Sequence, residues 1–407
     1  MTIAEILDPE VESKIAELKS RVEKDMKPTM KDDKNLFHRF LVARDYNVDQ
    51  AEIMLKKHLQ WRKDYKTDAI LTEKPDSDKN YLQFLQVEPY IGYSMIGYDK
   101  DQCPVTYWAS GNTDWKGIQL SVKLTMLRRY FVKIMEEESA VIENQSKKLG
   151  RNIKGVVSIM DLKNFSFAIA TDKRFISELM NVAKVNQDNY PERLKQVVLI
   201  NVPSYFTICF NFLKTVLAAS ILNKIQVYGS PEEYQPALLK IMDASDLPAF
   251  LGGKKTDPDG DPLCKSFIRH GGQIPSKFHV SKAKSTLAKC KEAKKLVVPR
   301  AAFSEIELNV KEANSVIEWE FETKTRDIGF GLFFKELEAG DEEKIVEIVS
   351  LQRLDTENFS ETGMFKCDKP GTYILLFDNS YSWIRSKEIY YKATVRSPKD
   401  YEKEMAS

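Results

Sequence analysis

The chain has 407 residues, with 61 Lys and Arg against 60 Asp and Glu and a formal net charge of +1. This balance argues against a nucleic-acid binder that relies on bulk charge, and the length allows two or three domains. Five scattered cysteines without a CxxC pair suit reduced thiols in the cytoplasm better than a disulfide framework or a zinc site. The most apolar stretch, residues 197–222, is interrupted by Asn201, Pro203, Asn211 and Lys214. It is too polar to span a bilayer, so any membrane contact is expected to be peripheral.

The first 75 residues follow a helical pattern. Phe37, Phe40 and Leu41 form one apolar set, and Asn47 stands three residues before Gln50, as an N-cap does. The segment that follows repeats its apolar residues at helical spacing, namely Ala51, Met54, Leu55 and Leu59. We therefore predict a helical lobe over residues 1–75.

After a polar break at residues 73–80, short strands alternate with helices. Residues 105–108 and 156–160 are rich in β-branched or aromatic residues, which favours strands. Residues 171–189 repeat apolar side chains at helical spacing, and residues 197–202 form another strand-like run. A strand, a helix and a strand within about forty-five residues indicate a parallel crossover.

A further unit of the same kind begins with the strand-like run at residues 225–228. Ser230, Pro231 and Glu233 then form the capping box of a helix, with proline at its first position. Together these units predict an α/β domain over residues 76–275.

Residues 204–219 are apolar on too many sides for an ordinary surface helix. At 3.6 residues per turn, the polar residues form one narrow stripe. The remaining arc includes Phe206, Phe210, Phe212 and Leu213, with Phe210 expected on a side that faces a bilayer. A bound lipid or a membrane surface would cover the surplus apolar surface. The alternative is a helix buried between two layers of protein.

The last third of the chain has two parts. Residues 277–300 carry eight Lys and Arg against one acidic residue, so residues 276–300 are predicted as a basic linker. This linker is either a solvated helix or a patch for an anionic membrane. Ile317, Trp319 and Phe321 then alternate with glutamates, and similar runs predict about seven strands. Residues 301–398 are therefore expected to form an all-β sandwich.

The sequence lacks the residue spacing that known catalytic and metal-binding motifs require. Residues 92–97 miss the Gly-x-Ser-x-Gly of a nucleophile elbow by one residue, and no two of the four histidines have metal-ligand spacing. Residues 257–261 resemble a calcium loop but lack a glutamate at the twelfth position, so a turn is expected. We therefore predict neither an enzyme nor a metal or cofactor site.

Several motifs together resemble the CRAL-TRIO lipid-transfer family over roughly residues 1–275. They are Phe-Leu-Val-Ala-Arg at 40–44, Trp-Arg-Lys at 61–63, Met-Asp-Leu at 160–162, Asn-Tyr-Pro-Glu-Arg at 189–193, Asn-Lys-Ile at 223–225 and residues 247–253. Residues 327–331 and 377–383 resemble a GOLD domain. The order of the two resembles the animal supernatant protein factor (tocopherol-associated protein) group. This resemblance implies a helical lobe and an α/β lobe around a deep apolar cavity, closed by a mobile gate helix at residues 204–219.

Such a cavity matches the energetics of carrying a lipid. Extracting a diacyl lipid exposes about thirty methylenes, each worth roughly 0.8 kcal/mol in water, or on the order of 20 kcal/mol in total. Only comparable apolar contact can offset this. Tyr107 and Ser158 are expected to line the cavity, together with the gate residues Phe206, Phe210, Phe212 and Leu213.

The resemblance also implies a headgroup site made of Arg62, Glu192 and Lys224. Arg and Lys neutralise phosphate, while Glu accepts hydrogen bonds from inositol hydroxyls. Alternatively, Arg62 and Glu192 form a salt bridge between lobes, and Lys224 is a solvated strand start. The chain has Ile221 where phosphoinositide binders can carry a threonine. It keeps the hydroxyl of Ser158 but has Val156 beside it, so choline lipids are less expected.

The first hypothesis is a cytosolic lipid carrier or sensor that associates peripherally with membranes. Its ligand is phosphatidylinositol or an isoprenoid such as tocopherol or squalene, and no nucleic acid is expected. The second hypothesis is a trafficking adaptor, in which the GOLD domain binds a partner protein through Tyr381, Trp383 and Tyr390 and the lipid lobe senses occupancy. A regulator of a membrane-bound sterol-pathway enzyme is a third reading.

Overall fold

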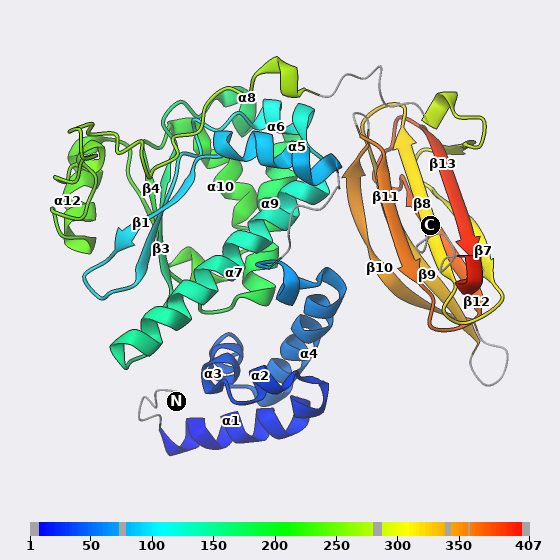
Figure 1. The fold of residues 1–407 in the computed structure, drawn as a ribbon, viewed down its shortest axis with the longest axis horizontal. Coiled ribbons are helices and arrows are strands. Elements are labelled where there is room, and N and C mark those ends of the chain that lie inside the picture. Colours follow the sequence, from blue (N-terminus) through cyan, green and yellow to red (C-terminus); the bar gives the residue numbers. More distant parts are fainter. Residues whose placement is uncertain (1–7, 73–78, 280–286, 338–342, 357–358, 401–407) are drawn as a thin grey trace. The chain divides into compact units, whose positions relative to one another are not determined.

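The computed structural model describes residues 8–72, 79–279, 287–337, 343–356 and 359–400. Most of the predicted polar break at 73–80, and residues 280–286 of the predicted linker, lie outside these ranges. The chain divides into two compact units, Met1–Phe278 and His279–Ser407, which are described separately (Figure 1). A search of the described helices finds none with the length and apolarity that crossing a membrane requires.

The first unit begins with a helical lobe, as predicted. The Asn47 side chain accepts a hydrogen bond from the Gln50 amide at 3.0 Å, which confirms the N-cap. The apolar faces pack into one core around Leu18, Phe37 and Leu55. Its elements are α1 (Pro9–Val22), η1 (Glu23–Asp25), α2 (Pro28–Lys31), α3 (Lys34–Val42), α4 (Val48–Tyr65) and η2 (Thr67–Ala69).

An α/β domain follows, and it confirms the predicted fold class. Its sheet has the order β1-β2-β3-β4-β5, in which β1 is antiparallel and the other neighbours are parallel. The strands are β1 (Tyr93–Tyr98), β2 (Pro104–Trp108), β3 (Val156–Asp161), β4 (Leu194–Ile200) and β5 (Ile225–Val227). The helices are α5 (Lys79–Val87), η3 (Glu88–Tyr90), α6 (Trp115–Ser121), α7 (Leu124–Leu149), α8 (Phe167–Ala170), α9 (Lys173–Asn189), η4 (Ser204–Phe206), α10 (Thr207–Leu213), α11 (Ala219–Leu222), α12 (Pro231–Ile241), η5 (Ala249–Leu251) and η6 (Ser276–Phe278).

The two faces of this sheet carry different helices. Because side chains alternate along a strand, Val157, Ile159 and Val198 point to the face that α12 covers. Val197 and Leu199 point to the other face and pack with side chains of α9 and α10. Figure 1 shows α12 on one side of the sheet and α7, α9 and α10 on the other. The capping box of α12 is confirmed, since the Glu233 carboxylate accepts from the Ser230 amide at 3.3 Å.

The predicted helix over residues 204–219 is wrong in its length. A 3₁₀ turn, η4, leads into α10, which ends at Leu213, and α11 begins only at Ala219. The side chain of Gln187 on α9 accounts for this break. It accepts from the Ala218 amide at 2.7 Å and donates to the Val216 carbonyl at 3.3 Å. These bonds accompany the extended backbone of Ala218 (φ −64°, ψ 151°), which separates the turns after α10 from α11.

The second unit is the predicted β-sandwich. Its two sheets have the orders β10-β9-β12-β7 and β11-β8-β13-β6, and Phe321, Phe330 and Phe377 lie in the core between them. The elements are η8 (Leu287–Lys289), β6 (Lys294–Val298), β7 (Phe303–Val310), β8 (Val316–Thr323), β9 (Asp327–Leu337), β10 (Glu343–Asp355), β11 (Glu361–Lys366), β12 (Gly371–Asp378) and β13 (Lys387–Arg396).

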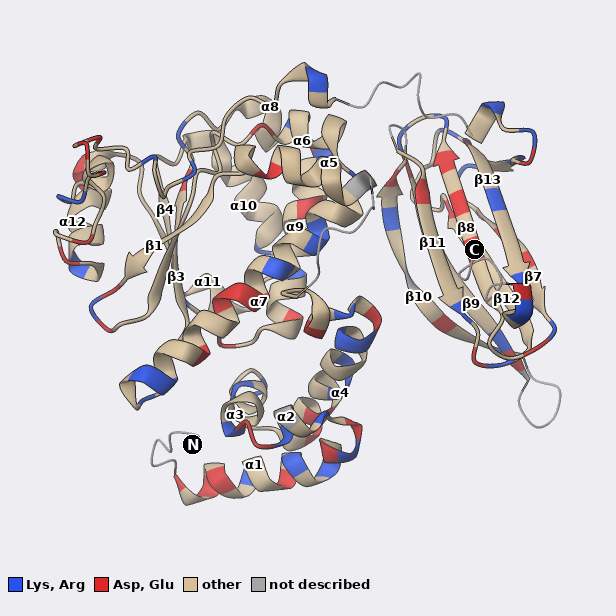
Figure 2. Cartoon of the chain, in the orientation of Figure 1, with Lys and Arg blue, Asp and Glu red and all other residues tan. Residues whose placement is uncertain are grey.

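One boundary of the sandwich corrects the prediction. Residues 294–298, assigned to the basic linker, form the edge strand β6, which pairs with β13. Two of the lysines that suggested a linker, Lys294 and Lys295, lie on this strand and are exposed, as lysines on edge strands commonly are. Over the first unit, basic and acidic side chains are intermixed on the helices (Figure 2).

Candidate functional site

The short helix α10 is only partly buried. Among the side chains of η4 and α10, Phe206 and Cys209 are buried. The Phe206 ring meets Phe165 edge-on at 5.9 Å and stacks on Phe210 at 6.2 Å. The alternative of a helix buried between two protein layers is therefore not what the structure shows. One side of α10 packs on α9 and on the loop around Phe165, while the side chains on its other side are exposed.

The two phenylalanines of α10 differ in their exposure. Phe210 is half-buried against Phe206, and the Lys214 ammonium lies 4.9 Å from the centre of its ring. Phe212 is 45% exposed, and Leu213 is half-buried. Which of these rings would face a bilayer stays a prediction. Phe212 is the more exposed of the two, because Phe206 and Cys209 are seated in the core.

An apolar pocket lies between α6, α7 and α9. It encloses about 340 Å³ of space, counting its open mouth. Trp115 and Phe175 belong both to its lining and to the hydrophobic cluster that holds Phe206. The Arg128 guanidinium pairs with the Glu178 carboxylate at 2.6 Å and joins α7 to α9 at the pocket. The pocket and the anchored side of α10 therefore share one apolar wall.

The two predicted strand residues lie on opposite faces of the sheet. Ser158 follows the face of Met160, and its hydroxyl is 3.0 Å from that of Thr106. Tyr107 points to the α12 face, where its hydroxyl donates to Asp161 at 3.0 Å and its ring meets Phe250 edge-on. Since neighbouring residues of a strand alternate, Tyr107 cannot share a cavity with the α10 side. Its assignment to the gated cavity is corrected.

Arg62, predicted to bind a headgroup, is held by two carboxylates. It donates to Glu136 on α7 at 2.8 and 3.2 Å and to Asp68 at 3.0 Å. The Tyr190 hydroxyl also donates to Glu136, at 2.6 Å. Burial opposes the charge on Arg62, but the carboxylates outweigh it and keep the pKa of Arg62 above its ordinary value. This cluster joins the end of α4 to α7 and to the segment after α9.

Glu192 and Lys224, the other two predicted headgroup residues, meet each other. The Lys224 ammonium lies 3.0 Å from the Glu192 carboxylate, and both side chains keep part of their surface exposed. Glu192 has a positive φ of 56° in the tight connection between α9 and β4. The structure thus brings two of the three residues together, while Arg62 is paired elsewhere. Their role toward a headgroup stays a prediction.

Sequence analysis missed the acidic residues of α7. Besides Glu136, this helix carries Glu138, whose carboxylate accepts from the Tyr93 hydroxyl at 3.3 Å. Burial raises the pKa of Glu138 to about 7, against the opposing effect of that hydrogen bond. The available signal was a run of three glutamates, 136–138, between the buried residues Ile134 and Ile142. Acidic residues between buried apolar positions of one helix predict buried polar contacts.

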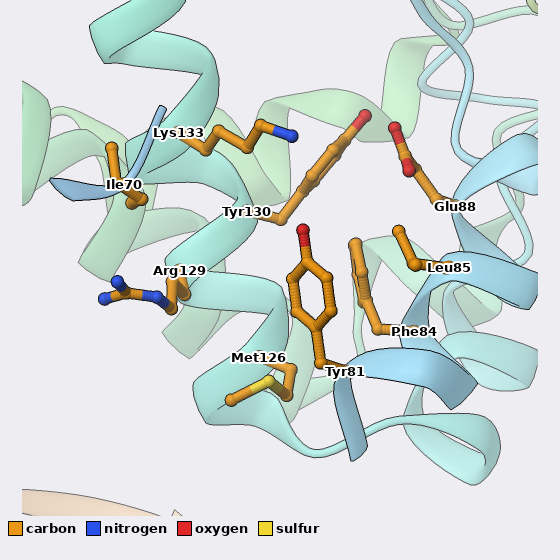
Figure 3. Close-up of a pocket in the computed structure, with 9 residues that line it drawn as sticks. All are labelled: Ile70, Tyr81, Phe84, Leu85, Glu88, Met126, Arg129, Tyr130 and Lys133. Atoms are coloured by element: carbon orange, nitrogen blue, oxygen red, sulfur yellow. The ribbon is translucent and has the colours of Figure 1, made fainter. Parts of the chain in front are cut away.

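A second pocket opens beside α5, η3 and α7. It encloses about 380 Å³ with its open mouth and is lined by Ile70, Tyr81, Phe84, Leu85, Glu88, Met126, Arg129, Tyr130 and Lys133. Figure 3 shows the ends of the Tyr130 and Glu88 side chains pointing toward one another. Within the described ranges, no group of three or more His, Cys, Asp and Glu residues could hold a metal ion.

The chain is similar in sequence to a known domain family and to several known proteins. Residues 89–253 match the sequence model of the CRAL/TRIO domain. The chain is similar to the protein ctg-1 of Caenorhabditis elegans, with 26% identity over 361 residues, which cover 88% of this chain and 90% of that protein. It is also 26% identical over 343 residues to the protein real-time of Aedes aegypti, covering 80% of this chain and 49% of that one.

A plant protein and one solved structure complete the comparison. The phosphatidylinositol/phosphatidylcholine transfer protein SFH4 of Arabidopsis thaliana is 31% identical over 266 residues, which cover 64% of this chain and 42% of that protein. The chain thus spans less than half of the mosquito and plant relatives. The crystal structure of Sfh5 matches with a TM-score of 0.45 and 14% identity, over 66% of this chain and 96% of that one.

Proposed function

Because residues 89–253 match the CRAL/TRIO domain and the second unit is a GOLD-like β-sandwich, we propose that this protein binds one lipid molecule and carries it between membranes. The ligand occupies the space between the sheet and the helices α7, α9 and α10. Carriage takes place in the cytoplasm, with brief peripheral contacts to membranes and without a catalytic step. The observation that carries the proposal is the packing of α10.

α10 has the features that a gate requires. Two side chains, Phe206 and Cys209, anchor it, and the hydrogen bonds of Gln187 hold the backbone that follows it. Because only these two side chains of residues 204–213 are buried, an outward movement would disrupt little core packing. Such a movement would expose the Phe206 and Phe210 rings, which a bilayer surface can cover. Phe212 already faces outward and would enter the bilayer first.

The size of the apolar pocket also favours a moving α10. Its volume of about 340 Å³ includes solvent at the open mouth, so the enclosed space is far smaller than the roughly 300 to 1,000 Å³ of pockets for drug-sized ligands. Two acyl chains need more room than this. Loading a diacyl lipid therefore requires α9 and α10 to move away from α7, which enlarges the space along the wall that Trp115 and Phe175 form.

Phosphatidylinositol or an isoprenoid lipid is the proposed ligand class. The name of the similar plant protein, a phosphatidylinositol/phosphatidylcholine transfer protein, supports the first. When a lipid binds, its phosphate takes the place of Glu192 beside the Lys224 ammonium. Lys224 then neutralises the phosphate, and Glu192 accepts hydrogen bonds from the inositol hydroxyls. Ile221 lacks the hydroxyl that phosphoinositide binders can place there, which counts against inositol lipids. Ser158 already shares its hydroxyl with Thr106, which counts against choline lipids.

The decisive experiment combines native mass spectrometry with vesicle transfer. Purified protein should carry a lipid that extraction identifies, and it should move labelled phosphatidylinositol or tocopherol between vesicles. Phe212→Asp should slow transfer by about tenfold or more, because it places a charge on the side of α10 that enters the bilayer. A folded chain that yields no lipid and never exchanges a labelled one would refute carriage.

Ile53→Asp is the matched control for the gate variant. Ile53 lies on α4 and is 50% exposed, close to the 45% of Phe212, so both changes add one charge at a similar exposure. Both variants should melt near the wild-type temperature, since surface substitutions cost little. Equal transfer rates in the two variants would show that α10 is not the gate, while leaving lipid binding itself standing.

A further inference from the structure

The β12–β13 connection presents two large apolar side chains to solvent. In this segment, residues 379–386, called the Trp383 loop here, Trp383 is 79% exposed and Ile384 is 83% exposed. The other four tryptophans of the chain are buried or half-buried. Exposing two adjacent apolar side chains to water is unfavourable in free energy, and the packing of this unit does not relieve it.

The Trp383 loop is nevertheless fixed to the sandwich. The buried Asn379 side chain donates to the carbonyls of Pro299 and Arg385, both at 2.9 Å. The Ala301 amide donates to Ser382 at 2.9 Å, and the Tyr381 hydroxyl donates to the Asp327 carbonyl at 3.1 Å. The backbone on both sides of Trp383 and Ile384 is therefore held. The two side chains stand on a rigid support rather than on a frayed segment.

The neighbouring turns carry positive charge. The Trp383 loop and the turns at residues 299–302 and 324–326 together contain Arg300, Lys324, Arg326 and Arg385, and no Asp or Glu. All four side chains are exposed, and Lys324 also pairs with Glu388 at 3.4 Å. The nearby carboxylate of Asp327 is already paired, with Lys387 at 3.2 Å and with Arg353. This end of the sandwich is apolar at its tip and basic around it.

We infer that the Trp383 loop is a membrane anchor that inserts Trp383 and Ile384 into the interface of an anionic lipid surface. Tryptophan prefers the boundary between headgroups and acyl chains, where its ring is covered and its N–H stays hydrated. Arg300, Lys324, Arg326 and Arg385 then meet the anionic headgroups, each adding attraction that falls off within a Debye length. The loop is already ordered, so binding costs little conformational entropy.

A membrane fits this surface better than a folded protein partner. Stable protein interfaces bury about 800 Å² on each side and need a pocket or a broad patch around their anchors. Here the two most exposed large apolar side chains of the described residues are neighbours on one loop, and its adjoining turns contain basic residues but no Asp or Glu. A lipid surface needs no matching pocket and supplies the opposite charge over any area.

The test uses the full chain and vesicles of phosphatidylcholine with or without phosphatidylserine. Wild-type protein should sediment with the phosphatidylserine vesicles, and high salt should reverse this. Trp383→Ser combined with Ile384→Ser should weaken that binding by about tenfold or more. Ile345→Ser, which removes a 51% exposed isoleucine from β10, is the matched control and should bind as wild type does. Circular dichroism should show all variants folded.

A second measurement reads the insertion directly. Lipids brominated on their acyl chains quench tryptophans that enter the bilayer, so they should quench the wild-type emission, and Trp383→Phe should abolish this quenching while keeping most of the binding. Wild-type binding by the double variant, or unchanged quenching in Trp383→Phe, overturns the inference, including the case in which the loop proves to bind a protein instead. Because the double variant leaves the first unit unaltered, its purified form should still contain lipid, which separates this test from that of lipid carriage.

Discussion

Replacing Arg62 should reveal whether it holds the helical lobe in place. Arg62 and Glu136 keep only 15% and 13% of their side-chain surface exposed, and two hydrogen bonds join them at 2.8 and 3.2 Å. Arg62→Ala leaves Glu136 with the Tyr190 hydroxyl as a donor, in a site where a lone charge is poorly solvated. Breaking a fully buried pair costs about 3 to 5 kcal/mol, so we expect about 3 kcal/mol for this partly exposed one.

A second variant, Glu136→Ala, tests whether the loss of stability comes from the Arg62–Glu136 pair. Glu136→Ala removes the stranded carboxylate, so Arg62→Ala with Glu136→Ala should cost less than the sum of the single changes, by about 1 to 2 kcal/mol. Arg21→Ala is the control, because Arg21 makes ion pairs with Glu17, Asp49 and Glu52 but is 34% exposed. Surface pairs of that kind contribute roughly 1 kcal/mol or less.

Urea unfolding of the full chain, followed by tryptophan emission and circular dichroism, measures the free energy of unfolding of the wild type and of each variant. If Arg62→Ala costs no more than Arg21→Ala, or if the double variant shows no coupling, Arg62 does not clamp the lobe. Its guanidinium would then be available for a lipid phosphate, as the family resemblance implies. If the clamp is present, a loss of lipid loading in Arg62→Ala reflects lobe movement as well as any headgroup contact.

Two further predictions concern single side chains. Burial holds the pKa of His58 at about 3, below the 6.5 of the exposed ring. The unfolded chain therefore takes up this proton first, so stability present above pH 6.5 is lost as pH falls toward 3. Urea titrations should show His58→Gln losing about 2 kcal/mol less than wild type between pH 7 and pH 5, and an identical loss would contradict this. Lys224→Ala should weaken phosphatidylinositol loading and spare tocopherol, with little change in melting temperature; equal weakening of both lipids would show that Lys224 has another role.

Local patterns were enough to predict most elements and the fold class. The cap at Asn47, the box at Ser230 and Glu233, and the alternation through Ile317, Trp319 and Phe321 each depend on residues a few positions apart. The parallel crossover from β3 through α9 to β4 follows from the lengths of its parts. These signals act within one element, so the amino-acid order carries them without knowledge of the fold.

What the sequence determined by itself was therefore the list of elements, their apolar faces and the two kinds of domain. Only the tertiary structure decided which partners the polar groups take. Glu136 reaches Arg62 across 74 positions, Gln187 ends the helix before Ala218, and the alternation of β2 turns Tyr107 away from α10. The physical reason is that an ion pair, a captured amide or a shared cavity depends on distances that the packing of separate elements sets. No periodicity along the chain records those distances.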